Sequence, residues 1–311
     1  MKLAMVFPGQ GSQAVGMLKA YGGAPAVESV RAVAAQALGE EFLHLLDEGP
    51  ADQLNLTVNT QPAMLTAGVA AYRAWVALGG AEPEIVAGHS LGEYSALVAA
   101  GALDLQQALP LVRFRALCMQ QAVPEGVGAM AAVLNLDDEA VRAACAEASQ
   151  GEIVQAVNFN APGQVVIAGH KAAVARAIDA CKAKGAKRAL PLPVSAPFHS
   201  ALMRPAAERL AGYLETVGIS PPRVALVNNV DVRVEREPAR IKDALVRQAA
   251  SPVRWADTVR FLAQQGVTHV LECGPGKVLT GLVKRIDGSL QAMALTDAAS
   301  VEQALAATRG N

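Results

Sequence analysis

Residues 84–97 read EIVAGHSLGEYSAL and indicate how the rest of the chain is arranged. A short apolar run ends at a serine between two glycines, and helix-forming residues follow, which predicts a strand, a tight turn and a helix. Gly88, Ser90 and Gly92 match the GxSxG nucleophile elbow, whose small flanking residues allow a sharp turn. Such a turn exposes the serine hydroxyl and directs the next backbone N–H and the helix N-terminus toward it. A Gly/Ser turn without chemistry is the alternative that this pattern alone leaves open.

The composition allows a large core and excludes several classes of protein. The 311 residues are 52% hydrophobic but only 4% aromatic, which suits helices packed on a buried sheet better than an all-β sandwich. The net charge of -1 provides no overall field that would favour nucleic acid or an anionic membrane. No apolar run is long enough for a signal peptide or a membrane span, so we expect a cytoplasmic protein. The four scattered cysteines lack zinc-like spacing, so we expect reduced thiols and no metal site.

Around the elbow, strand and helix patterns alternate, which predicts a mostly parallel sheet. We expect Asn59 or Thr60 to cap a helix over residues 60–78. In a helix over residues 105–122, we expect Pro110 to produce a kink or to move the start of the helix later. The expected strands are residues 3–7, 224–228 and 269–273 and the apolar run before the elbow that ends at Ala87. The expected helices are residues 26–38, 60–78, 105–122, 201–217, 241–250, 255–265 and 277–285.

The middle of the chain follows a different pattern, with the order strand, helix, strand, strand, helix, strand. The strands are expected at residues 130–134, 153–158, 164–168 and 188–192, and the helices at 138–148 and 171–183. The NAPG sequence at residues 160–163 has the chemistry of the turn that would join the middle pair. This βαββαβ order predicts a ferredoxin-like subdomain over residues 126–195, inserted into an α/β-hydrolase-like large subdomain formed by residues 1–125 and 196–311.

A nucleophilic serine needs a base, and the position of His199 favours it over the other histidines. His199 lies late in the chain, in a loop rich in small residues and proline, where proteins with this elbow place their base. Of the others, His89 adjoins Ser90 on the tight turn, where neighbouring side chains diverge, and His44, His170 and His269 fall in positions typical of structural or solvated histidines. No aspartate stands out as a third member, and three are possible from spacing: Asp231, Asp243 and Asp257.

Arg115 is unusual because it falls on the apolar face of the expected helix 105–122. A buried guanidinium must find an anion or several acceptors, since an unpaired one is very costly. A structural pair with an aspartate or glutamate is one explanation, and an anionic ligand is another. The apolar positions that share its face are Ala108, Leu111, Val112, Cys118, Met119 and Ala122.

Several short motifs, spread over essentially the whole chain, carry a family resemblance. They are FPGQGSQ at 7–13, GHSLGE at 88–93, Arg115 with Met119 and Gln120, NFNAPGQ at 158–164, PFHS at 197–200 and ECGPG at 272–276. Together they resemble the bacterial malonyl-CoA:acyl carrier protein transacylases, the malonyl transferases of fatty-acid synthesis, and their polyketide-synthase relatives.

The resemblance implies a role for each of five residues. Ser90 would take a malonyl group from coenzyme A, and His199 would accept its proton and later activate the carrier-protein thiol in ping-pong acyl transfer. The backbone N–H groups of Gln10 and Leu91 would form the oxyanion hole. A main-chain carbonyl, which maps to Gln248, would orient His199, so no aspartate would be needed.

The same resemblance implies that the partner of Arg115 is the acyl group during turnover, because malonyl carries a free carboxylate that a guanidinium can bind through two hydrogen bonds. Such a pair could contribute about 2 to 5 kcal/mol of discrimination against acetyl. Phe198 before His199 is similar to the malonyl-selective pattern. Three further residues are candidates for the substrate pocket: His89, Met119 and Asn160.

The implied substrate is malonyl-CoA, and the implied partner is acyl carrier protein, which supplies phosphopantetheine. We expect no permanently bound cofactor and no binding to nucleic acid or membranes. We expect the protein to be a monomer. Carrier proteins are acidic, so a basic surface should receive them. One candidate patch comprises Lys171, Arg176, Lys182, Lys184, Lys187 and Arg188, and another comprises Lys277, Lys284 and Arg285.

Two other functional classes remain open from the sequence. A serine hydrolase or thioesterase would use the same elbow to pass the acyl group to water, and a non-catalytic scaffold would bind the carrier without transfer. The sequence also leaves open whether the acceptor carrier serves fatty-acid synthesis, polyketide synthesis or malonate metabolism.

Overall fold

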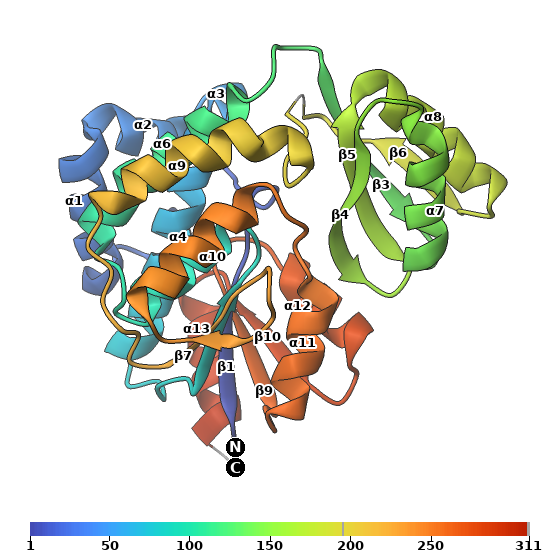
Figure 1. Cartoon of the computed structure of the whole chain (residues 1–311). Coiled ribbons are helices and arrows are strands. Elements are labelled where there is room, and N and C mark those ends of the chain that lie inside the picture. The colour runs from blue at the N-terminus through green and yellow to red at the C-terminus, as the bar shows by residue number, and fades with distance from the viewer. Residues whose placement is uncertain (195, 310–311) are drawn as a thin grey trace.

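Two separate β-sheets organise the chain in this computed structural model, which describes residues 1–194 and 196–309. The larger sheet lies apart from the smaller one, which contains β3 to β6 (Figure 1). Its strand order is β10-β9-β1-β2-β7-β8, and every neighbouring pair in it is parallel except β7 with β8. This confirms the predicted mostly parallel sheet. Its strands are β1 (Leu3–Phe7), β2 (Ile85–Gly88), β7 (Ala225–Val227), β8 (Val234–Glu235), β9 (His269–Cys273) and β10 (Gln291–Leu295).

Helices cover both faces of the larger sheet, and the alternation of side chains along β1 shows why. Leu3, Met5 and Phe7 are buried against one group of helices that includes α1, α4 and α6, whereas Ala4 and Val6 are buried against α11 and α12. The helices of this part are α1 (Pro25–Leu38), α2 (Glu40–Glu48), α3 (Ala51–Leu54), α4 (Thr57–Ala77), α5 (Gly92–Ala99), α6 (Leu105–Gln120), α9 (Arg204–Glu215), α10 (Pro238–Ala249), α11 (Trp255–Gln264), α12 (Val278–Ile286) and α13 (Ala298–Arg309), with 3-10 turns η1 (Lys19–Tyr21) and η2 (Ala201–Met203).

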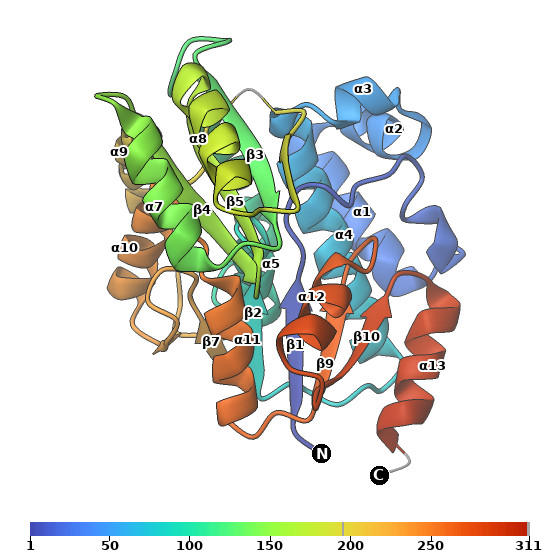
Figure 2. The ribbon, with the colours of Figure 1, turned by 90° about the vertical axis from the view of Figure 1, so that its right-hand side faces the viewer.

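The smaller sheet is antiparallel, with the strand order β4-β5-β3-β6. Helices α7 and α8 pack on one of its faces (Figure 2). Together with the chain order βαββαβ, this is the predicted ferredoxin-like arrangement. The elements are β3 (Gly128–Leu134), α7 (Asp138–Ser149), β4 (Val154–Ala161), β5 (Gln164–His170), α8 (Lys171–Ala183) and β6 (Arg188–Pro191). The subdomain boundary predicted at residue 195 falls on a residue outside the described ranges, and the boundaries stay a prediction.

One expectation about a helix start was wrong, and another was confirmed. Helix α4 begins at Thr57, and neither Asn59 nor Thr60 caps it, because Asn59 Nδ2 donates to Gln53 O and Thr60 Oγ1 to Leu54 O. Helix α6 begins directly after Asp104, as expected, and the Asp104 carboxylate accepts the N–H of Gln106 at 2.9 Å. The helix continues through Pro110, so the proline does not move its start.

The remaining expectations concern membranes, thiols and metals. In the two described ranges, no helix combines the length and the apolar character needed to cross a bilayer. All four cysteines are free and buried. Across the same ranges, no cluster of three or more His, Cys, Asp or Glu side chains could hold a metal ion.

Candidate active site

The turn between β2 and α5 holds Ser90 in a strained conformation that only small neighbours permit. Ser90 has a φ of 52°, in the left-handed region. A Cβ atom on Gly88 would lie 1.9 Å from the backbone of Gly92, and one on Gly92 would lie 2.0 Å from the carbonyl oxygen of Phe7. The two glycines of the GxSxG motif are therefore required by close backbone contacts within the elbow and with β1.

Ser90 and His199 form a hydrogen-bonded pair. Ser90 Oγ lies 2.7 Å from His199 Nε2, and His199 Nδ1 lies 2.9 Å from the backbone oxygen of Gln248, in the last turn of α10. A carbonyl oxygen only accepts, so Nδ1 carries the proton and Nε2 is left to accept the serine proton. Burial, together with the nearby charge of Arg115, lowers the pKa of His199 to about 3, which keeps the imidazole neutral.

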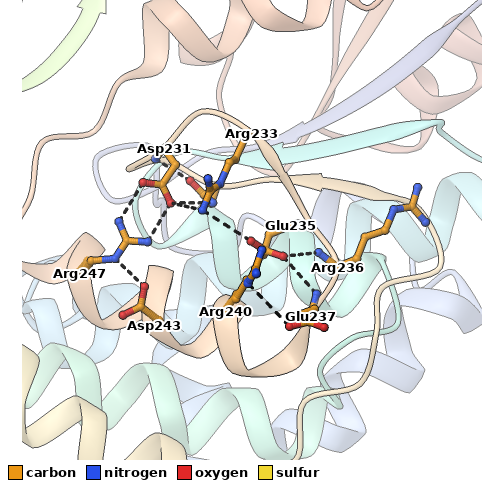
Figure 3. A network of polar contacts seen from close by, with 9 residues as sticks. Asp231, Arg233, Glu235, Arg236, Glu237, Arg240, Asp243 and Arg247 are labelled. Atoms are coloured by element: carbon orange, nitrogen blue, oxygen red, sulfur yellow. Dashed lines mark hydrogen bonds and ion pairs between the residues drawn. The ribbon is translucent and has the colours of Figure 1, made fainter.

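None of the three aspartates that spacing left open forms a hydrogen bond with His199 in the described ranges. Asp231 accepts two hydrogen bonds from Arg247, at 2.9 and 2.8 Å, and Asp243 accepts one from the same guanidinium (Figure 3). Asp257 pairs with arginines on its own helix and just before it. The carbonyl of Gln248 therefore occupies the place where a triad aspartate would lie.

Two backbone N–H groups beside Ser90 are available as donors. In the part of the chain that the structure describes, neither Gln10 N nor Leu91 N donates a hydrogen bond, and both residues line the cavity. The loop after β1 reaches this position because Gly9 lies against the elbow, where a Cβ atom would be 2.7 Å from His89 O. The pair could therefore receive the oxygen of a tetrahedral intermediate.

Arg115 is 1% exposed and lies directly against the serine. Its Nη1 donates to Gln61 Oε1 at 2.7 Å, and its Nη2 donates to Gln248 Oε1 at 2.8 Å and to Ser90 Oγ at 3.1 Å. The guanidinium also lies 5.3 Å from the centre of the Tyr94 ring, and burial lowers its pKa. No carboxylate forms an ion pair with it among the described residues, so the structural pair considered above is absent.

These groups lie at the base of a cavity of about 650 Å³. Of the four candidates for the substrate pocket, His89, Met119 and Phe198 line this cavity, and Asn160 does not. Asn160 instead contacts the ring of His89, with Oδ1 2.8 Å from Nε2, and Asn158 of the same strand faces the cavity. Because β4 has irregular register here, the side of each residue could not be assigned from alternation alone.

Three site residues were missed by the sequence analysis. Asn229 fastens the elbow, since its Oδ1 accepts from Ser90 N at 2.8 Å and its Nδ2 donates to Gly88 O at 2.6 Å. Gln61 holds Arg115, and Glu93 accepts from Gln248 Nε2 at 2.8 Å. The available signal was a polar side chain in a helix with many apolar residues: Gln61 on α4 precedes the run from Pro62 to Leu65, and Glu93 on α5 precedes Tyr94, Ala96 and Leu97.

Comparisons with known proteins identify the family to which the chain belongs. The acyl transferase domain family matches residues 4–303. Over 305 residues the chain is 56% identical to the malonyl CoA-acyl carrier protein transacylase of Escherichia coli (strain K12), a match that covers 98% of this chain and 99% of that protein.

Solved structures give the same result over nearly the whole chain. The acyl-carrier-protein S-malonyltransferase of Burkholderia pseudomallei 1710b superposes with a TM-score of 0.97 at 62% identity, covering 98% of this chain and 100% of that one. A malonyl-transacylase in complex with its type II PKS acyl-carrier protein gives a TM-score of 0.97 at 55% identity, covering 99% and 100%. The chain therefore belongs to the acyl transferase domain family, among the malonyl CoA-acyl carrier protein transacylases.

Proposed function

We propose that this protein transfers malonyl from malonyl-CoA to the phosphopantetheine thiol of an acyl carrier protein, through a malonyl-serine intermediate. The observation that carries the proposal is a buried arginine, Arg115, which has no carboxylate partner among the residues that the structure describes and contacts a serine that is paired to a neutral histidine. A free carboxylate on the acyl group would complete that arrangement.

In the first half-reaction, Ser90 Oγ attacks the thioester carbonyl while its proton passes to His199 Nε2. The carbonyl oxygen becomes an oxyanion and is stabilised by the N–H groups of Gln10 and Leu91. The intermediate collapses, the carbon–sulfur bond breaks, and the coenzyme A sulfur takes the proton from His199. The products are malonyl-Ser90 and free coenzyme A, with His199 neutral again.

In the second half-reaction, the carrier's thiol enters in place of coenzyme A. His199 accepts the thiol proton, the sulfur attacks the serine ester, and the proton returns to Ser90 Oγ as the ester bond breaks. These steps need only side chains and backbone N–H groups of the chain, so we propose that no cofactor takes part.

Arg115 would hold the malonyl carboxylate through both half-reactions. In the free protein, Arg115 Nη2 donates one hydrogen bond to Ser90 Oγ. Acylation of that oxygen would free this donor for the malonyl carboxylate. The malonyl carboxylate would then satisfy a buried charge, and acetyl would leave that charge without an anion. The expected discrimination is about 2 to 5 kcal/mol.

The proposed carrier partner needs a docking surface. The two basic patches differ in whether their positive side chains pair with carboxylates or with neutral oxygens. In the first patch, Arg176 is held by Glu152 and Lys184 by Glu147. In the second, Arg285 donates to Gln164 Oε1 and Pro162 O. The docking surface, the predicted monomer and the predicted cytoplasmic location all stay predictions.

A product assay tests the proposed function against the hydrolase alternative. Malonyl-CoA is incubated with the protein and with a panel of phosphopantetheinylated carrier proteins, and malonyl-carrier and free malonate are both quantified. We expect malonyl-carrier as the main product and none with Ser90→Ala. Free malonate as the main product would make the protein a hydrolase, and the carrier that is acylated fastest would indicate the pathway.

A further inference from the structure

Glu93 is a buried carboxylate next to the site that the transfer steps leave without a role. It is 1% exposed and lies in the first turn of α5, three residues after Ser90. Its Oε2 accepts from Asn229 N at 3.1 Å and from Gln248 Nε2 at 2.8 Å. Both donors are uncharged N–H groups, and both belong to residues that contact the elbow or His199.

The residue through which Glu93 could act is Gln248, which is fully buried. Its backbone oxygen orients His199, its side-chain nitrogen donates to Ser90 O at 3.0 Å and to Glu93, and its side-chain oxygen accepts from Arg115 Nη2 at 2.8 Å. The two ends of an amide are alike in shape, so hydrogen-bond partners decide which end faces which neighbour.

We propose that Glu93 is a positioning residue that fixes the Gln248 amide with its nitrogen inward and its oxygen toward Arg115, and so sets the guanidinium for a malonyl carboxylate. The inference deepens the proposed function and rests on it. A carboxylate only accepts, so it opposes the reversed amide, in which oxygen would face Glu93 and Ser90 O and the NH₂ group would face the Arg115 guanidinium. In the reversed amide, Arg115 Nη2 loses its buried acceptor.

Glu93 also gives the arrangement a dependence on pH. Burial raises the pKa of Glu93 to about 7, opposed by the hydrogen bonds from Gln248 and Asn229 and by the charge of Arg115, while Asp231 raises it further. The two histidines of the site shift in the opposite direction: burial lowers the pKa of His89, and burial with the charge of Arg115 lowers that of His199 to about 3. As the pH falls through neutrality, Glu93 becomes protonated, and the hydrogen bond that its carboxylate accepts from Gln248 Nε2 therefore weakens.

The test compares kcat/KM for malonyl-CoA and acetyl-CoA in Glu93 variants. Glu93→Met removes the acceptor at similar size, and Glu93→Gln keeps an acceptor without the charge. We expect the malonyl-to-acetyl ratio to fall roughly tenfold in Glu93→Met and less in Glu93→Gln. Glu272 supplies the matched control, since it is fully buried and its carboxylate accepts hydrogen bonds from Leu279 N and from Thr280 at the start of α12. Glu272→Met should lower stability and leave the ratio unchanged.

A second measurement needs no substitution, in case Glu93→Met fails to fold. The wild-type ratio is measured from about pH 8.5 to about pH 5.5, where ionisations of coenzyme A affect both substrates alike and cancel. We expect it to fall with a midpoint near pH 7, and to be flat in Glu93→Gln. A flat wild-type ratio, a folded Glu93→Met with the wild-type ratio, or an equal loss in Glu272→Met would overturn the inference. A wild-type protein that does not prefer malonyl at any pH would overturn the proposed function itself.

Discussion

At the scale of single residues, Arg115 determines which acyl group the proposed site should accept. Its fork is held by two glutamine oxygens, Gln61 Oε1 and Gln248 Oε1, so it is in place before a ligand arrives. A pre-positioned charge loses little side-chain entropy on binding, which makes it an effective selector.

Replacing this arginine should therefore alter the selectivity for malonyl over acetyl more than it alters the fold. We expect Arg115→Ala to lower malonyl transfer by more than roughly tenfold, because the carboxylate loses both hydrogen bonds, while acetyl transfer persists or rises. Steady-state kinetics with the two coenzyme A esters measures this. Equal losses for both esters would show that Arg115 only supports the fold.

His199 should be needed in both half-reactions, because the same Nε2 accepts first the serine proton and later the carrier thiol proton. We expect His199→Ala to slow acylation by malonyl-CoA and deacylation by the carrier by at least about a hundredfold each. Rapid-quench measurements of each half-reaction would separate them. An acylation rate equal to that of the wild type would remove His199 as the base.

At the scale of the elements, the elbow depends on how closely β1, β2 and α5 approach. A Cβ atom on Gly92 would lie 2.0 Å from the backbone oxygen of Phe7. Phe7 belongs to β1, an inner strand of the larger sheet, so this oxygen cannot move without the strand. The chemistry of Ser90 is thus tied to the packing of a strand that is distant in sequence.

A pair of glycine substitutions tests this dependence. We expect Gly92→Ala to lower the free energy of unfolding by about 1 to 3 kcal/mol or more, through overpacking, and to abolish acylation. Gly212→Ala is the control, because Gly212 lies inside α9 with open space around it, and alanine there should stabilise by about 0.5 to 1 kcal/mol. Urea unfolding of both variants gives the comparison, and an equally stable Gly92→Ala would contradict the account of the elbow.

The elements that the sequence predicted best are those whose boundaries carry a local signal. Helix α8 and strand β9 have the expected bounds, and Asp104 marks the start of α6. The start of α4 was missed because the side chains of Asn59 and Thr60 bond to the preceding turns instead of capping. Helices α2, α3 and α13 and strand β10 were not predicted at all, because their short amphipathic patterns gain stability from packing on the rest of the fold.

At the scale of the whole molecule, the proposed site lies where the two sheets meet. Strand β4 of the smaller sheet hydrogen-bonds to the loop after α10, with Phe159 N donating to Val253 O at 3.0 Å and Val253 N donating to Val157 O at 2.8 Å. That loop follows Gln248, whose carbonyl orients His199. The cavity therefore has a floor from the larger sheet and a wall from the smaller one.

This arrangement explains which parts of the site the sequence could predict. Ser90, His199 and Arg115 stand out because a motif, a loop context and a charge on an apolar face mark them locally. Gln61, Glu93 and Asn229 act through contacts between elements that only the folded chain brings together. The choice of Gln248 came from family resemblance, since nothing local marks a backbone carbonyl as the partner of a histidine.

Passage of the malonyl group through Ser90 can be followed by intact-protein and peptide mass spectrometry of the acylated chain. The protein is mixed with malonyl-CoA alone, sampled, and then given a phosphopantetheinylated carrier protein. We predict one malonyl group per chain, located on Ser90, which disappears as malonyl appears on the carrier. Malonyl-carrier formed at full rate without any malonyl-Ser90, or free malonate released in its place, would contradict the account.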